Sequence, residues 1–372
     1  MNSANTPEKQ KKSRDYEKFP LHAWIFLGLA ALSLVLYLIA VASPRFADGF
    51  NSTVGAAVRA LLAHLTSWIP FSLAEMLIYC IPLLLIGLGI YVYRRRCATW
   101  RSMWVFVGCI AAAFSLLFSL FVFSFGTGYH TPTLDERLGL SAGEITAEDL
   151  ERTTAILTAI VTETADTVTF GDDGFSVMPY DLDTLNDRLL DAYGTVCAEH
   201  GFISSLNSRI KPVLASKAMS YTHITGVYSY FTGEANLNVA FPDYTIPYTA
   251  AHELAHQRGI ARENEANFVA FLVCMASDDP YIRYSGALNL LEYVSSALAR
   301  ADAARYRAWL KGLDARVRGE LVAYSHFFDT YRDSSASLVA GAVNDTYLKL
   351  HGNEAGTASY GLVVELAVAY FR

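Results

Sequence analysis

The chain has 372 residues, of which 17% are charged and 53% are hydrophobic, and its formal net charge at pH 7 is −7. A negative charge, with no stripe of basic and aromatic residues, argues against a protein that binds nucleic acid, and five cysteines are too few for a disulfide-built scaffold. Most of the hydrophobic excess lies before residue 127, so we expect a membrane region at 1–126 and a folded domain at 127–372.

Three apolar stretches with almost no charge lie in the first third of the chain: Leu21–Ser43, Phe71–Tyr93 and Met103–Phe125. Each has about 20 residues or more, the length that a helix needs to cross about 30 Å of hydrocarbon. Buried core helices are the alternative, but three such runs close together favour membrane spans. For the first run a cleaved signal peptide is a further alternative, and its length and the two later spans favour an anchor.

The basic residues predict the orientation of these spans. They gather before the first span and between the second and third, whereas the loop between the first two spans has only Arg45 and Arg59. Because basic loops stay in the cytoplasm, the N-terminus is expected on the cytoplasmic side of the plasma membrane and the domain at 127–372 on the outer side. On that side a bridge between Cys197 and Cys274 is allowed, but the apolar helical run around Cys274 favours a buried free thiol.

The loop between the first two spans predicts a short helix on the outer membrane surface. Within Asn51–Ile69, apolar residues such as Val58, Leu61 and Leu65 recur at helical spacing. Glu75, at the start of the second span, is expected to be an interfacial carboxylate.

The domain after the third span is expected to be a mainly helical α+β fold. Ile224–Phe231 and Ala235–Phe241 alternate between apolar and polar residues and are separated by Thr232 and Gly233, which predicts an antiparallel β-hairpin. Capping residues and apolar periodicity predict the helices. These are Thr146–Thr164, Leu182–His200, Tyr248–Arg258, Arg262–Ala276, Asp279–Arg300, Ala303–Tyr331, Ser335–Leu350 and Thr357–Phe371.

The segment His252-Glu253-Leu254-Ala255-His256 carries the clearest chemistry in the chain. Residues four apart share a helix face, so both imidazoles can reach one metal ion, and Glu253 can reach a water on that ion. Either histidine alone would more simply be a core residue. As a spaced pair around Glu253 on an apolar helix, they predict a metal site.

A carboxylate on the next helix is expected to be the third ligand. Glu263 and Asn267 lie four apart and share a face with small residues, which would let this helix approach the histidine helix closely. Glu265 points about 200° around the same helix and has the simpler interpretation of a solvated charge. We therefore expect His252, His256 and Glu263 to bind one zinc ion, with Gly259 turning the chain between the two helices and Asn267 supporting a histidine ring.

These residues carry a family resemblance. His252–His256, followed by Glu-x-x-Ala-Asn at 263–267, resembles the gluzincins, zinc peptidases with two His ligands and one Glu, and is similar to the membrane-bound heat-shock and prenyl-protein endopeptidases. With three spans, Thr232–Asn238 and Tyr284–Gly286, nearly the whole chain resembles a bacterial family of membrane-anchored zincin-like proteins catalogued as a domain of unknown function. Asn267 stands where many gluzincins have Asp, and the link to Glu263 is shorter than in most relatives.

The resemblance implies a zincin-like fold and a peptidase mechanism. Zinc would polarise the scissile carbonyl and activate a water, and Glu253 would act as the general base. In zincins a strand beside the histidine helix pairs with the substrate, so Ile224–Phe231 or Ala235–Phe241 has that role unless the hairpin is purely structural. Tyr284 is the first candidate for the donor to the oxyanion; the other candidates are His223, Tyr228 and His326. Glu234 and Asn236 are explained as turn residues.

Three functions are compatible with these residues. The first is a membrane-anchored zinc metallopeptidase that acts outside the cytoplasm on peptides or on proteins at the membrane surface. The second is a non-catalytic, metal-stabilised sensor or binding protein of the envelope, and the third is a zinc amidase for cell-wall material. Glu253 favours an enzyme, because a purely structural zinc site has no need of a base.

Overall fold

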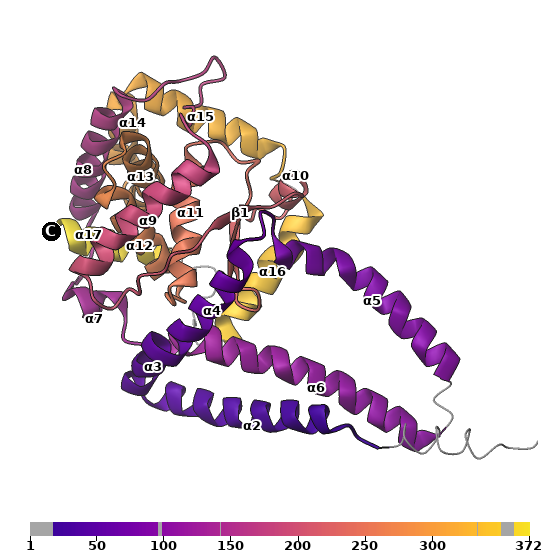
Figure 1. Cartoon of the computed structure of the whole chain (residues 1–372). Coiled ribbons are helices and arrows are strands. Elements are labelled where there is room, and N and C mark those ends of the chain that lie inside the picture. Colours follow the sequence, from indigo (N-terminus) through magenta and orange to yellow (C-terminus); the bar gives the residue numbers. More distant parts are fainter. Residues whose placement is uncertain (1–17, 96–98, 142, 333, 351–360) are drawn as a thin grey trace, which may run out of the picture.

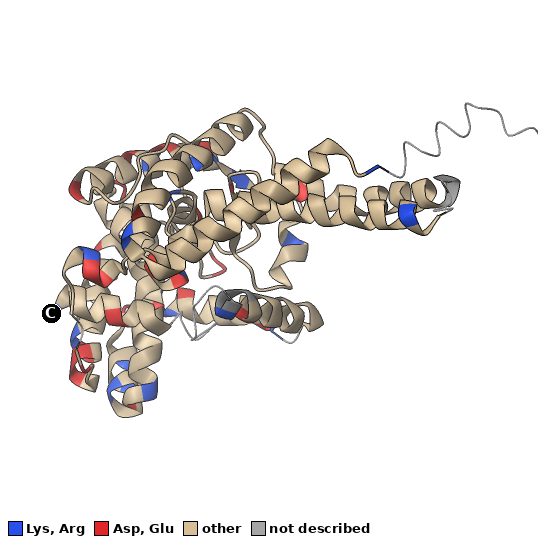
Figure 2. Cartoon of the chain, turned by 90° about the horizontal axis from the view of Figure 1, so that it is seen from below, with Lys and Arg blue, Asp and Glu red and all other residues tan. Residues whose placement is uncertain are grey.

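Three helices in the first third of the chain are long and apolar enough to cross a membrane: α2 (Leu21–Ala42), α5 (Leu73–Arg95) and α6 (Trp100–Ser124). The computed structural model describes residues 18–95, 99–141, 143–332, 334–350 and 361–372. The tail before residue 18, expected in the cytoplasm, lies outside these ranges. All three predicted stretches are helical, and α2 packs along α6, while α5 approaches α6 at the end remote from the domain and separates from it toward the domain (Figure 1). In Figure 2 charged residues are sparse along these helices and frequent on the domain.

The connection between α2 and α5 is helical too. It consists of α3 (Pro44–Phe50), a π-helical turn η1 (Asn51–Gly55) and α4 (Ala56–Ser67). The helix predicted within Asn51–Ile69 is therefore present, and it exposes Leu61 and Leu65 while its Arg59 is buried. A surface helix of a water-soluble protein buries its leucines and exposes its charged residues, so α4 has the reverse arrangement.

The domain is built mainly from helices, as predicted. It contains η2 (Gly126–His130), α7 (Leu134–Leu138), α8 (Ala147–Ala165), α9 (Leu182–Glu199), α10 (Ser216–Ser220), α11 (Thr245–Gln257), α12 (Glu263–Ala276), α13 (Pro280–Ala301), α14 (Ala303–Gly312), α15 (Ala315–Asp329), α16 (Ser335–Leu350) and α17 (Leu362–Phe371). The single helix predicted over Ala303–Tyr331 is wrong. It breaks after Gly312, and Asp314 starts α15 by accepting a hydrogen bond from the backbone N–H of Arg316.

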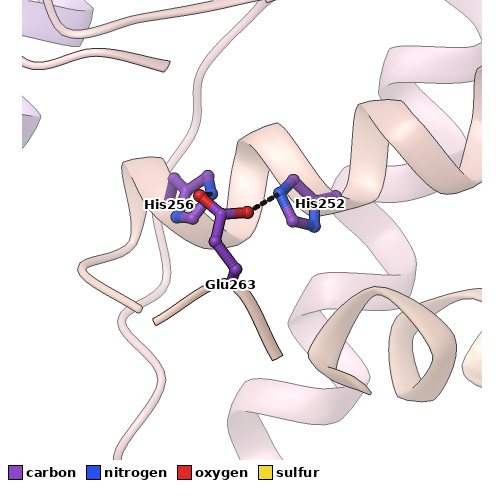
Figure 3. Close-up of side chains that lie close together, drawn as sticks. All are labelled: His252, His256 and Glu263. Carbon is purple, nitrogen blue, oxygen red and sulfur yellow. Dashed lines mark ion pairs between the residues drawn. The ribbon is translucent and has the colours of Figure 1, made fainter. Parts of the chain in front are cut away.

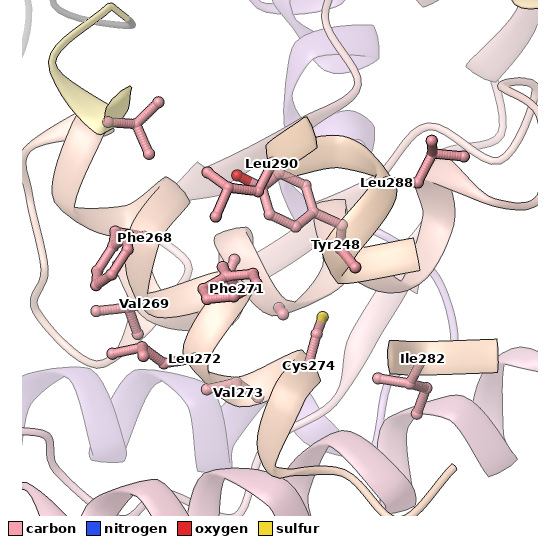
Figure 4. Packing of buried hydrophobic residues seen from close by; sticks show 14 of the residues in the cluster. Tyr248, Phe268, Val269, Phe271, Leu272, Val273, Cys274, Ile282, Leu288 and Leu290 are labelled. Carbon is pink, nitrogen blue, oxygen red and sulfur yellow. The ribbon is translucent and has the colours of Figure 1, made fainter. Parts of the chain in front are cut away.

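The core lies between α11, α12 and α13, with α8, α9 and α17 packed around them. Figure 4 shows part of it, including Tyr248 of α11, Phe268 and Phe271 of α12 and Ile282 of α13. Cys274 of α12 is a buried free thiol, as predicted, and Cys197 is also free. Part of the helix predicted at Thr357–Phe371 falls outside the described residues; its remainder forms α17 against this core.

A small mixed sheet lies against α11. Its strands are β1 (Ile210–Pro212), β2 (Gly226–Ser229) and β3 (Glu234–Leu237), in the order β1-β3-β2. The predicted hairpin is confirmed as the antiparallel pair β2 and β3, although each strand is shorter than expected. β1 pairs with β3 in parallel and was not predicted, since three residues including a lysine and a proline give no alternation. Within the sheet, β2 therefore keeps one edge unpaired.

The sheet is joined to α5 through buried polar groups. The Glu234 carboxylate accepts hydrogen bonds from the backbone N–H groups of Leu73 (3.0 Å) and Ala74 (2.8 Å), at the start of α5. It also forms a fully buried ion pair with Lys211, at 2.5 Å. The interpretation of Glu234 as a turn residue is therefore wrong, because the residue caps the N-terminus of an apolar helix. Glu75 of α5 binds back to the domain, through the backbone N–H of Leu214 at 2.7 Å.

Candidate metal centre

The two histidines lie on a buried helix that holds them on one face. α11 has small or apolar residues around them, and Ala251, Leu254 and Ala255 are fully buried. The four-residue spacing brings the rings of His252 and His256 together, with their centroids 4.6 Å apart. The sharp turn required after α11 is made by Gly259, whose φ of +94° favours glycine.

Glu263, the first residue of α12, completes a cluster with the two histidines (Figure 3). Its carboxylate oxygens lie 3.3 Å from Nε2 of His252 and 3.6 Å from Nε2 of His256. One ligand atom from each of the three residues lies within 4.8 Å of the others. Two imidazole nitrogens and one carboxylate oxygen converging in this way are the ligand types found in catalytic zinc sites.

The ring of His256 is oriented for metal binding. Its Nδ1 lies 2.7 Å from the carbonyl oxygen of Ile260. Because a carbonyl oxygen can only accept a hydrogen bond, Nδ1 must carry a proton to form this bond. In neutral His256 the proton is then on Nδ1, so Nε2 has a free lone pair directed toward Glu263. The residues present therefore fit a zinc ion. Asn267 was expected to support a histidine ring, but its buried side-chain nitrogen has no hydrogen-bond partner among the described residues. Its backbone carbonyl accepts a hydrogen bond from the Tyr248 hydroxyl at 3.0 Å.

Glu265 is placed away from the histidines, on the opposite face of α12. It accepts hydrogen bonds from the backbone N–H of Leu134 (3.0 Å) and from the Arg262 guanidinium (2.8 Å). The interpretation of Glu265 as a solvated charge is wrong, because the residue is buried in this pair of contacts. Of the two carboxylates, only Glu263 joins the histidines.

Glu253 lies on the sheet side of α11, against β2. It is 4% exposed, and burial raises the pKa of its carboxyl to about 6. The nearby backbone N–H of Tyr228 opposes this rise in pKa, and Oε2 of Glu253 is buried with no hydrogen-bond partner in the part of the chain that the structure describes. A Cβ on Gly226 would lie 2.6 Å from Glu253 Oε1, so only glycine lets β2 approach the carboxylate this closely.

The aromatic residue after α6 packs directly on His256 of the candidate site. The ring of Phe125 lies edge-on to the ring of His256, 5.7 Å away, and contacts the ring of Tyr228 at 5.4 Å. One end of an apolar helix thus forms a wall of the site.

A buried arginine connects the turn after α11 to the segment before α5. Arg59 is 1% exposed and donates to the side chain of Asn51 (2.8 Å) and to the backbone carbonyls of Ser124 (2.8 Å) and Arg258 (3.3 Å). Asn51 in turn donates to the carbonyl of Gly259, at 3.0 Å. Burial lowers the pKa of Arg59 to about 10, and the guanidinium remains charged at neutral pH.

The sequence marked Arg59 only as a charge in a loop and did not indicate that Asn51 belongs to the site. The available signal was the presence of Arg59 in a helix made mostly of apolar residues. If such an arginine is buried, its charge needs hydrogen-bond partners elsewhere in the structure. Those partners, the carbonyls at the end of α11, could not be identified from local sequence.

The candidate oxyanion donors are dispersed in the structure. The hydroxyl of Tyr284 is fully buried and donates to Glu320 in the core, so it is directed away from the three ligands. His223 contacts the backbone carbonyl of Tyr331 through Nε2, at 2.7 Å, and His326 is exposed on α15. Of the four candidates, Tyr228 adjoins the site, because its ring packs on Phe125, which in turn packs on His256.

The comparisons with known proteins give one result. A family model described as a protein of unknown function (DUF3810) matches residues 50–368, which includes Asn51, Arg59, the sheet and all three residues of the cluster. No curated protein and no solved structure matches the chain. Because the match spans most of the sequence, the chain belongs to the DUF3810 family.

Proposed function

We propose that the chain is a membrane-anchored zinc metallopeptidase of the gluzincin type, whose catalytic domain lies outside the cytoplasm. The observation that carries this proposal is the convergence of His252, His256 and Glu263 beside Glu253, on a buried helix. The distribution of basic residues supports the orientation. A site needed only for stability would have no use for a second carboxylate with a raised pKa next to the metal ligands.

In this proposal the residues divide the chemistry between them. His252, His256 and Glu263 hold the zinc ion, which when bound would polarise the substrate carbonyl and make water more acidic. Glu253 accepts a proton from the attacking water and passes it to the leaving amine. A pKa near 6 suits both steps, because the carboxyl can change protonation state near neutral pH.

The free edge of β2 is the proposed site for the substrate backbone. The carbonyls of Thr225 and Ser229 accept hydrogen bonds from Asn238 and Gly233, toward β3. In an antiparallel pair the alternate residues direct their backbone groups to the other side, so those of Gly226 and Tyr228 point to the free edge. An extended peptide added there would lie next to Glu253. β3, the other candidate from the sequence, is paired on both sides and has no edge to offer.

The experiment uses the full chain in lipid nanodiscs. Bound zinc is measured by mass spectrometry, and cleavage of a peptide library is compared with that by Glu253→Gln. We expect about one zinc per chain in both proteins and a loss of cleavage of at least about 100-fold in the variant. Full zinc content, with peptides uncut or cut equally well by Glu253→Gln, would reject the peptidase; parallel assays of cell-wall fragments test the amidase.

A further inference from the structure

α16 has its apolar residues on the outside. Leu338, Val339 and Val343 are 76%, 65% and 64% exposed, and with Ala342 they form one continuous arc of the helix. The opposite arc, which includes Ser337 and Asn344, is half-buried. A helix on a water-soluble domain would bury the apolar arc and expose the polar one.

α4 has the same inverted arrangement. It buries Arg59 at 1% exposure and exposes Leu61 and Leu65 at 58% and 55%. α4 lies between α2 and α5 in the chain, so its exposed face belongs to the part of the molecule that contains the candidate membrane spans. The outward apolar face of α16 is thus repeated in a helix that adjoins those spans.

The position of α16 agrees with that of a helix on a membrane surface. In Figure 1 it runs across the direction of α2 and α6, at the level where these helices meet the domain. A helix that crosses the direction of the spans at this level lies in the plane of the bilayer interface.

We propose that α16 is an interfacial helix that inserts its Leu338, Val339, Ala342 and Val343 face into the leaflet on the domain's side of the bilayer. Its occupant is lipid and not a protein partner, because these four residues are aliphatic and α16 crosses the direction of α2 and α6 at the level where they meet the domain. The described charges of α16, Lys349 and Asp345, pair with each other at 2.7 Å. Apolar burial therefore drives the insertion, and anionic headgroups are not required.

The test places a nitroxide spin label on the full chain in nanodiscs of phosphatidylcholine, after replacement of the five native cysteines. Labels at Val339→Cys and Val343→Cys report the apolar face, and Ser337→Cys is the matched control on the opposite face. We expect the first two labels to be several-fold more accessible to oxygen than to a water-soluble nickel chelate, and the control label to lack this preference.

Two results would overturn the proposal. High access of the nickel chelate to the labels at 339 and 343, with no preference for oxygen, would show that the face lies in water. Dipolar broadening at 339 that disappears on dilution with unlabelled chain would show that a second copy covers the face. Neither readout depends on enzymatic activity, so the result is independent of the proposed function.

Discussion

The side-chain amide of Asn51 donates a hydrogen bond to the backbone carbonyl of Gly259, 3.0 Å away, across 208 residues of sequence. Gly259 forms the turn between His256 and Glu263, so this bond ties the spacing of the proposed zinc ligands to the segment between α2 and α5. Arg59 supports the same turn by donating to the Arg258 carbonyl at 3.3 Å. The site is thus built from both parts of the chain.

Asn51→Ala is expected to weaken zinc binding by about 10-fold, because loss of a group that orients a ligand has effects of this size. Zinc affinity is measured by competition with a chelator. Ser52→Ala is the control, since Ser52 is exposed and bonds only within its own helical segment. Equal affinities in the two variants would show that Asn51 does not position the ligands.

Gly226→Ala is expected to abolish peptide cleavage while zinc stays bound. The new methyl group would fall 2.6 Å from Glu253 Oε1 and displace either the proposed base or the β2 edge. Cleavage and zinc content are measured on the same preparation. Gly194→Ala, where a methyl group meets no other atom within 4 Å, should behave as wild type. An active Gly226→Ala protein would argue against β2 as the substrate strand.

Glu263→Gln is expected to lower the zinc content strongly, whereas Glu265→Gln should keep zinc and lower stability by about 1–3 kcal/mol. The reason is that Glu263 faces both histidines and Glu265 accepts hydrogen bonds from Leu134 and Arg262. Zinc content and melting temperature separate the two effects. Zinc loss in Glu265→Gln with zinc retained in Glu263→Gln would reverse the assignment.

The stability of the domain is expected to fall as the pH rises from about 4.5 to 7, partly through Glu292. Burial raises the pKa of this carboxyl from 4.5 to about 7, and its Oε1 accepts a hydrogen bond from the Tyr244 hydroxyl at 2.8 Å. Because the folded-state pKa is the higher one, the stabilisation is complete below the unfolded pKa and is lost as the pH passes the folded pKa.

Glu292→Gln should therefore show a smaller decrease in melting temperature over this range than wild type, corresponding to about 1–3 kcal/mol. Glu199→Gln, at an exposed position on α9, serves as the control and should follow the wild-type curve. Parallel curves for wild type and Glu292→Gln would show that Glu292 does not bind a proton on folding.

The sequence predicted those features that depend on neighbours along the chain. The three apolar helices, the hairpin around Gly233 and the helices carrying His252, His256 and Glu263 follow from spacing, hydrophobicity and turn residues. Features that join distant segments were missed: β1, the Lys211–Glu234 pair, and the contacts of Arg59. Local periodicity has no information about partners that lie 23 residues away, as in the Lys211–Glu234 pair, or 199 residues away, as for Arg59 and Arg258. Tyr284 was expected near the site for the same reason, although its hydroxyl binds Glu320, 36 residues away.

Glu234 has a consequence for the order of folding during synthesis. It caps the start of α5 from 161 residues further along the chain, so α5 leaves the ribosome long before its two terminal N–H groups can be satisfied by that carboxylate. The apolar helices α2, α5 and α6 are therefore made first, so that α5 is already present as a template when the sheet closes onto it. A fragment that begins at residue 127 would lack this template and would leave the Glu234–Lys211 pair without the backbone donors of α5.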